Sequence, residues 1–143
     1  MTSVVLRPAL ISDIPAVLTF WKLAAEDTNR VESDSGPALE HLLERDPGAL
    51  MLAEDHGRIV GSLIAGWDGW RCHLYRFAVH PEQRRRGIGS ALLEAAEQRF
   101  ISLGGHRADA MVLADNDLAH PAWAAAGYAA QPEWQRWVKR LAG

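Results

Sequence analysis

Three arginines and a Gly-x-Gly turn separate an apolar stretch from an amphipathic one, and their residue types suit anion binding. The segment reads Phe77-Ala78-Val79-His80-Pro81-Glu82-Gln83-Arg84-Arg85-Arg86-Gly87-Ile88-Gly89-Ser90. The start of a helix exposes unpaired backbone N–H groups with a partial positive charge, and glycine lets a bulky anion approach the backbone. Arginine adds forked donors that match phosphate. The segment therefore predicts a pyrophosphate site at the beginning of a helix.

Two common glycine motifs do not fit this turn. A dinucleotide fingerprint requires a glycine where this chain has Leu92, and a nucleotide-hydrolase loop requires Lys-Ser or Lys-Thr where it has Ser90-Ala91. The remaining pattern, Arg84-x-x-Gly87-x-Gly89 between an apolar strand and a helix, resembles the acyl-CoA signature of the GNAT superfamily of N-acetyltransferases. An exposed basic turn is the alternative, and the strand and helix that frame the motif favour the acyl-CoA interpretation.

The resemblance implies a set of contacts with acetyl-CoA as co-substrate. The end of the strand would pair with the peptide-like pantetheine arm, and the turn would wrap the pyrophosphate. One or more of the three arginines would meet the 3′-phosphate, and the sequence leaves open which. The implied cofactor-binding residues are Phe77, Ala78, Val79, Arg84, Arg85, Arg86, Gly87, Ile88, Gly89, Ser90 and Asn116.

The candidate acid and base depart from the family pattern. The general-acid tyrosine of the family falls at Trp123, and an indole N–H is not a useful acid. His73 and Tyr75 alternate on one face of a strand, at positions resembling the paired histidines of arylalkylamine N-acetyltransferases. His73 is the candidate base and Tyr75 a candidate proton donor. A hydrogen-bonded His73 with no catalytic duty is an equally good interpretation, and His120 is a weaker substitute acid.

The resemblance implies direct transfer of an acetyl group to a primary amine in a ternary complex. The acceptor, a small molecule or a peptide amine, is not identified. Four acidic residues, Glu26, Asp27, Glu32 and Asp34, would attract a cationic amine, although a solvated loop explains them equally well. A GNAT module that binds acyl-CoA without catalysis is the alternative function. The resemblance also leaves a homodimer open.

Hydrophobic periodicity predicts the elements that position these residues. The predicted strands are Val4–Leu6, Ala49–Glu54, Arg58–Trp67, Trp70–Val79, Arg107–Leu113 and Glu133–Leu141, the last also compatible with a helical turn. Helices are predicted from Ser12 or Asp13 to Ala25, over Ala38–Arg45, from Ile88 to Leu103, and after Asp115 up to Gly127. This order matches the α+β GNAT fold: a mixed, mainly antiparallel sheet with helices on both faces and splayed fourth and fifth strands.

Composition limits the alternatives. The 143 residues, 48% of them hydrophobic, suit one GNAT domain over 1–143. A net charge of −3 argues against a nucleic-acid partner, and no apolar run is long enough to predict a membrane partner. The single cysteine and the absence of a leader pattern at the N-terminus predict a cytoplasmic protein. The six histidines show no metal-ligand spacing, so no metal is expected.

Overall fold

A computed structural model of the chain describes residues 3–24, 35–112 and 120–141. Its elements are β1 (Val4–Pro8), a 3-10 turn (Ile11–Asp13), α1 (Ile14–Ala24), α2 (Gly36–Arg45), β2 (Leu50–Asp55), β3 (Arg58–Trp67), β4 (Cys72–Val79), a second 3-10 turn (Pro81–Gln83), α3 (Ile88–Leu103), β5 (Ala108–Ala110) and α4 (His120–Ala125).

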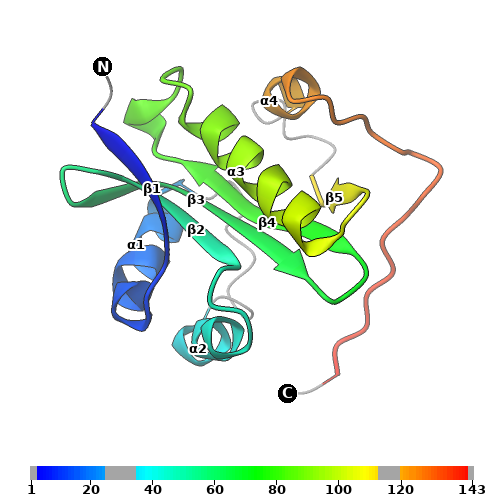
Figure 1. The fold of residues 1–143 in the computed structure, drawn as a ribbon, viewed down its shortest axis with the longest axis horizontal. Coiled ribbons are helices and arrows are strands. Elements are labelled where there is room, and N and C mark those ends of the chain that lie inside the picture. Colours follow the sequence, from blue (N-terminus) through cyan, green and yellow to red (C-terminus); the bar gives the residue numbers. More distant parts are fainter. Residues whose placement is uncertain (1–2, 25–34, 113–119, 142–143) are drawn as a thin grey trace.

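The five strands form one sheet whose spatial order, β1-β2-β3-β4-β5, follows the chain. The first four strands pair antiparallel, and β5 pairs parallel with β4. Helices α1 and α2 cover one face of the sheet and α3 covers the other (Figure 1). The α+β fold with a mixed, mainly antiparallel sheet is therefore confirmed.

Each face of the sheet carries its own hydrophobic core because the side chains of a strand alternate between the two faces. On the first face, Val17 and Trp21 of α1 pack with Leu50, Leu52 and neighbouring residues. On the other face, Leu92 and Phe100 of α3 pack on Leu63. Gly61 lies under α3, where a Cβ atom would come within 3.0 Å of Ile88 and Leu92. The absence of a side chain at Gly61 therefore lets the start of α3 approach the sheet closely.

A bulge interrupts β4 in the middle of its pairing with β3. The register passes from Ile64↔Tyr75 to Ser62↔Ala78, so three steps on β4 oppose two on β3. Arg76 adopts φ = 54° there, a left-handed conformation that costs energy for a residue with a side chain. No local sequence pattern predicts this bulge. Beyond it Phe77 and Val79, like Cys72 and Leu74 before it, pack on the α3 side.

Strands β4 and β5 separate after three paired residues. Their register covers Cys72↔Ala108, His73↔Asp109 and Leu74↔Ala110, whereas β4 runs on to Val79. The predicted strand Arg107–Leu113 is thus shorter in the structure, where β5 ends at Ala110. The backbone of β4 beyond Leu74 has no strand beside it on this edge among the described residues, as the expected splay requires.

The predicted final strand over Glu133–Leu141 is wrong. Residues 134–141 form neither strand nor helix, and they run outside the body of the fold (Figure 1). Trp134, Trp137 and Leu141 are 74%, 90% and 91% exposed. The apolar residues recur at helical spacing rather than in alternation, and the described part of the chain offers them no strand partner. By contrast, α4 stops before Gly127, at φ = 94°, as predicted.

Candidate active site

The turn between β4 and α3 presents uncapped backbone donors. Gly87, at φ = 78°, is the residue before the helix, and no side chain caps α3. Its carbonyl accepts the first helical hydrogen bond from Ala91 N–H at 3.0 Å. The N–H groups of the first turn, from Ile88 to Ser90, point out of the helix end with the positive end of its dipole. This is the geometry predicted for a pyrophosphate site.

The three arginines of the turn have different surroundings. The guanidinium of Arg86 donates to the Asp55 carboxylate at 3.1 Å and also contacts Gln83. Ser3, followed by Arg86, holds the pKa of Asp55 below its usual value. Arg84 and Arg85 make no hydrogen bond or ion pair with the described residues, and Arg85 has a left-handed φ of 69°. Two guanidinium groups are therefore available beside the start of α3.

A buried histidine shapes the loop that carries these arginines. His80 is 8% exposed, and its Nδ1 atom accepts a hydrogen bond of 3.1 Å from the backbone N–H of Glu82. Its own backbone N–H donates to the carbonyl of Val60 at 2.8 Å. His80 thus anchors the end of β4 to β3, and the loop leaves the sheet at a fixed point.

Gly89 lies against the end of β4. A Cβ atom there would come within 2.9 Å of the ring of Phe77, while the side chain of Ile88 is buried in the core. Ile88 can therefore offer only its backbone to a ligand. Ala78 faces the opposite core, and Val79 packs on the α3 side. These placements bring the end of β4 and the first turn of α3 together, as the sequence predicts.

Trp123, at the position of the family's acid, is a packing residue. Its indole is 8% exposed and lies edge-on to Phe77, with ring centroids 5.0 Å apart. On its other side it meets Tyr128 at 5.1 Å, whose hydroxyl donates to Glu97 at 2.8 Å. Burial, followed by Glu97, raises the pKa of Tyr128. Trp123 thus braces the strand end, and its chemistry offers no acid.

His73 and Tyr75 share the face of β4 opposite α3. His73 Nδ1 lies 2.7 Å from Asp109 Oδ1 on β5, and its Nε2 lies 3.7 Å from Asp68 Oδ2. The ring of Tyr75 lies over Gly66, where a Cβ atom would be 3.2 Å from the hydroxyl. Burial, followed by the charge of Asp46, raises the pKa of Tyr75, so its hydroxyl stays protonated and can donate. The two carboxylates beside His73 are functional candidates that no sequence motif indicates.

Three further expectations concern other parts of the chain. Asn116, Glu26, Asp27, Glu32 and Asp34 lie outside the described residues. His120 begins α4 and is exposed.

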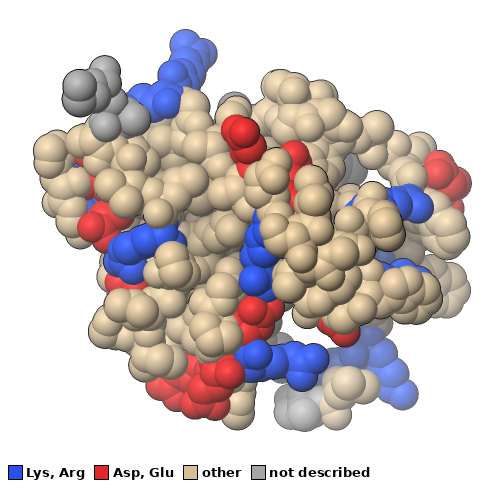
Figure 2. All heavy atoms as spheres, viewed as in Figure 1, with Lys and Arg blue, Asp and Glu red and all other residues tan. Residues whose placement is uncertain are grey.

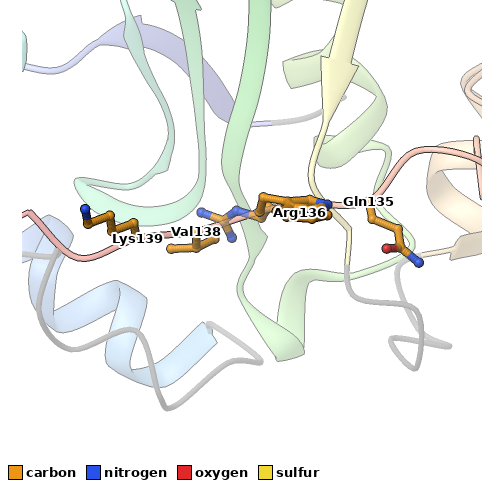
Figure 3. Close-up of a pocket in the computed structure, with 5 residues that line it drawn as sticks. Gln135, Arg136, Val138 and Lys139 are labelled. Carbon is orange, nitrogen blue, oxygen red and sulfur yellow. The ribbon is translucent and has the colours of Figure 1, made fainter.

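Figure 3 shows a surface pocket lined by Gln135, Arg136, Trp137, Val138 and Lys139. Because these five residues are consecutive in one exposed segment, that pocket joins no two elements and is not the candidate site.

Charge is mixed on the visible face, and the described helices are short or polar. On the face in Figure 2, basic and acidic side chains are interspersed, without a broad basic field. Within ranges 3–24, 35–112 and 120–141, no group of three or more His, Cys, Asp or Glu residues could hold a metal ion. No helix in these ranges combines the length and apolar character needed to cross a membrane.

Comparison with known proteins decides the family. The model of the acetyltransferase (GNAT) family matches residues 17–128. This chain belongs to the GNAT family. It is 39% identical to acetyltransferase ECA0875 of Pectobacterium atrosepticum over 105 residues, which cover 73% of each chain.

Solved structures show the same GNAT fold. The PaiA N-acetyltransferase of Thermoplasma acidophilum, in complex with coenzyme A, has a TM-score of 0.78 and 16% identity, and the match covers 91% of this chain and 92% of that one. AAC(6′)-Iy, in complex with the bisubstrate analog CoA-S-monomethyl-acetylneamine, has a TM-score of 0.76 and 18% identity, covering 96% and 99%. The family carries acetyltransferase activity, and the GNAT resemblance in the sequence is confirmed.

Proposed function

We propose that this GNAT protein transfers an acetyl group from acetyl-CoA to a primary amine by direct attack in a ternary complex. The observation that carries the proposal is the uncapped start of α3 beside Arg84 and Arg85. It lies at the end of a strand whose other edge is open after Leu74. An anion site and an adjacent open strand edge together suit a pyrophosphate joined to a peptide-like arm.

Acetyl-CoA would lie along β4 from the loop toward the bulge. The N–H groups of the α3 first turn, including Gly89 and Ser90, hold the pyrophosphate. Arg84 and Arg85 neutralise phosphate charge, and the backbone from Phe77 to Val79 pairs with the pantetheine arm. Asn116, outside the described residues, is proposed to contact that arm. The carbonyl oxygen of the thioester then lies near the bulge, where a strand N–H of Phe77 or Ala78 stabilises its developing charge.

The acceptor would enter from the opposite end of β4. His73 and the phosphate-binding loop are separated by about 20 Å, the length of six strand residues at about 3.3 Å each. An amine of lysine type has a pKa of about 10.4, so its neutral form costs roughly 4–5 kcal/mol at pH 7. His73 takes the ammonium proton of the acceptor, directly or through water, and the neutral amine nitrogen attacks the carbonyl carbon of the thioester. The C–S bond then breaks and coenzyme A leaves as a thiolate, which Tyr75 or water protonates. The nitrogen, now part of an amide, gives up its second proton to the resulting phenolate or hydroxide.

The class of acceptor is supported by one structural neighbour. The bisubstrate analog bound to AAC(6′)-Iy joins CoA to acetylneamine. For this chain, neamine is therefore a suitable first acceptor in a wider amine screen.

A second candidate function is an acyl-CoA-binding module without catalysis. The buried Trp123 favours it, because the general acid of the family is replaced by a packing residue. Binding of acetyl-CoA is common to both candidates, and release of free coenzyme A with an amine is not.

Titration calorimetry with acetyl-CoA and with CoA, at two salt concentrations and without acceptor, is the primary experiment. Micromolar binding that weakens with salt supports the phosphate site. No binding by a folded sample rejects both candidates. Where binding is found, thiol release measured with neamine and a panel of amines separates them: an enzyme releases coenzyme A with at least one amine, and a binding module with none.

A further inference from the structure

The ring of His73 lies between two carboxylates that do not contact it equally. His73 and Asp109 are partners in the parallel register of β4 and β5, so their side chains leave the same face of the sheet. Nδ1 of His73 lies 2.7 Å from Asp109 Oδ1, within hydrogen-bond distance. Nε2 lies 3.7 Å from Asp68 Oδ2, which is too far for a hydrogen bond. The contacts of the two nitrogens are therefore different in kind.

The chemistry of a carboxylate places the ring proton. An ionised carboxylate only accepts hydrogen bonds, so the contact with Asp109 requires the proton on Nδ1 of His73. In a neutral imidazole the other nitrogen then carries the lone pair. Nε2 of His73 is thus the basic atom.

Asp68 makes its hydrogen bonds to the backbone of the turn and not to the His73 ring. Its Oδ1 atom accepts from the backbone N–H groups of Trp70 at 2.8 Å and Arg71 at 2.6 Å, and so closes the turn between β3 and β4. Those backbone hydrogen bonds are the main cause of a lowered pKa for Asp68, which keeps it ionised. The other oxygen of Asp68, Oδ2, is the atom that lies 3.7 Å from Nε2 of His73.

We infer that Asp109 is a positioning residue for the proposed base. It fixes the neutral His73 with its proton on Nδ1 and its lone pair on Nε2. The inference deepens the proposed function and rests on it for the catalytic role of His73. The position of the ring proton, however, follows from the Asp109 contact and can be measured without any turnover.

The test combines a spectroscopic and a kinetic measurement. Long-range ¹H–¹⁵N correlation spectra of labelled protein, recorded where the imidazole is neutral, report which nitrogen of His73 is protonated. Wild type is expected to carry the proton on Nδ1. Asp109→Asn keeps an oxygen acceptor and should keep this tautomer. Asp109→Ala removes the acceptor of the Nδ1 proton. The remaining carboxylate, Asp68, should then draw the ring proton to Nε2. Asp68→Asn, a matched loss of one charge, should leave the proton on Nδ1.

The kinetic arm uses acetyl-CoA with neamine, or with the most active amine of the screen. His73→Ala should lower kcat about 100-fold, at the lower end of the contribution of a general base. Asp109→Ala should lower kcat about tenfold or more without changing the KM for acetyl-CoA, and Asp109→Asn should recover most of the loss. Combining Asp109→Ala with His73→Ala should cost no more than His73→Ala alone, because Asp109 acts through His73.

The outcomes separate this inference from the function on which it rests. A proton on Nε2 in wild type, or an unchanged tautomer in Asp109→Ala, overturns the inference whether or not the protein is an enzyme. Failure of wild type to bind acetyl-CoA overturns the proposed function and leaves the tautomer result readable. If His73→Ala and Asp109→Ala both turn over as fast as wild type while the tautomers are as expected, the catalytic role of His73 is overturned. Acetyl transfer by the protein then still stands.

Discussion

Ser62 donates a hydrogen bond of 2.9 Å from its hydroxyl to the backbone carbonyl oxygen of Arg76, at the bulge in β4. The same hydroxyl oxygen accepts a bond of 2.8 Å from the indole N–H of Trp21 on α1. Ser62 is fully buried, so its hydroxyl joins α1 to β4 from within the core. The bulge that shapes the strand edge is therefore fixed from the α1 side of the sheet.

Ser62→Ala should lower the free energy of unfolding by about 1–3 kcal/mol, because it removes the hydrogen-bond partner of the buried Trp21 indole N–H and of the Arg76 carbonyl. Chemical denaturation monitored by circular dichroism measures the change. Ser102→Ala, at an exposed position of α3, is the matched control and should stay within about 0.5 kcal/mol of wild type. Equal stability of the two variants would show that the bulge does not depend on this bond.

Ser90→Glu tests the anion site without weakening the helix. A negative side chain in the first turn of α3 interacts favourably with the helix dipole, so stability should be kept or raised. The same charge should repel the pyrophosphate and lower the affinity for acetyl-CoA at least about tenfold. Calorimetry gives the affinity and thermal denaturation the stability. Gln98→Glu adds the same charge to an exposed position in the same helix and should bind as wild type does. If Ser90→Glu also binds normally, the phosphates lie elsewhere.

Arg84 and Arg85 should contribute more to binding than Arg86 does. The guanidinium of Arg86 is already paired with Asp55, whereas the first two have no ion pair with described residues. Arg84→Ala and Arg85→Ala are therefore expected to weaken acetyl-CoA binding and to reduce its dependence on salt. Arg86→Ala removes the same charge and should change both quantities less. A larger effect for Arg86 would mean that its pairing with Asp55 is exchanged for a phosphate contact on binding.

Asp13 should make stability depend on pH. Arg7 donates two hydrogen bonds of 2.8 Å to its carboxylate and, through Nε, a third of 2.8 Å to Glu54. Arg7 is the main cause of a pKa for Asp13 below its ordinary 3.8 in the folded protein. A lowered folded-state pKa gives stability that is present above pH 3.8 and lost as the pH falls through the lower value.

Asp13→Asn should therefore cost about 1 kcal/mol at pH 7, a value that allows for partial exposure of Arg7, and less at a pH well below 3.8. Urea unfolding at the two pH values measures the difference. Glu44→Gln, at an exposed position of α2, changes the same formal charge and should leave the pH dependence as in wild type. A cost for Asp13→Asn that does not vary with pH would assign the effect to packing instead.

Local patterns predicted those features that local interactions determine. The apolar run of β3, the glycine turn and the single apolar face of α3 each identify their element within a short window. The bulge at Arg76 has no such signal, since it depends on Ser62, 14 residues away, and through it on Trp21, a further 41 residues from Ser62. Asp109 reaches His73 across 36 residues of sequence, and only the parallel register brings them together.

The incorrect final strand has a related cause. A strand requires a partner as well as suitable residues, and the sequence of Glu133–Leu141 shows only the residues. In the part of the chain that the structure describes, β5 ends at Ala110 and pairs with β4 alone. Hydrogen-bonding partners of an edge strand are a property of the assembled sheet, so the residue pattern could not decide between a strand and the extended segment observed.

The agreement between the spatial and the chain order of the strands has a consequence for folding kinetics. His56 and Gly57, at φ = 50° and 78°, form a turn of the type that matches the twist of a two-residue hairpin, so β2 and β3 meet at little loop-closure entropy. Strand β4 follows β3 after a short turn. Pairing of β1 with β2, by contrast, closes a long loop that contains both α1 and α2. We expect the β2–β3–β4 meander to nucleate folding and β1 to dock late. Substitutions in β1 should then change the unfolding rate and leave the folding rate nearly unchanged, which corresponds to kinetic φ-values near zero.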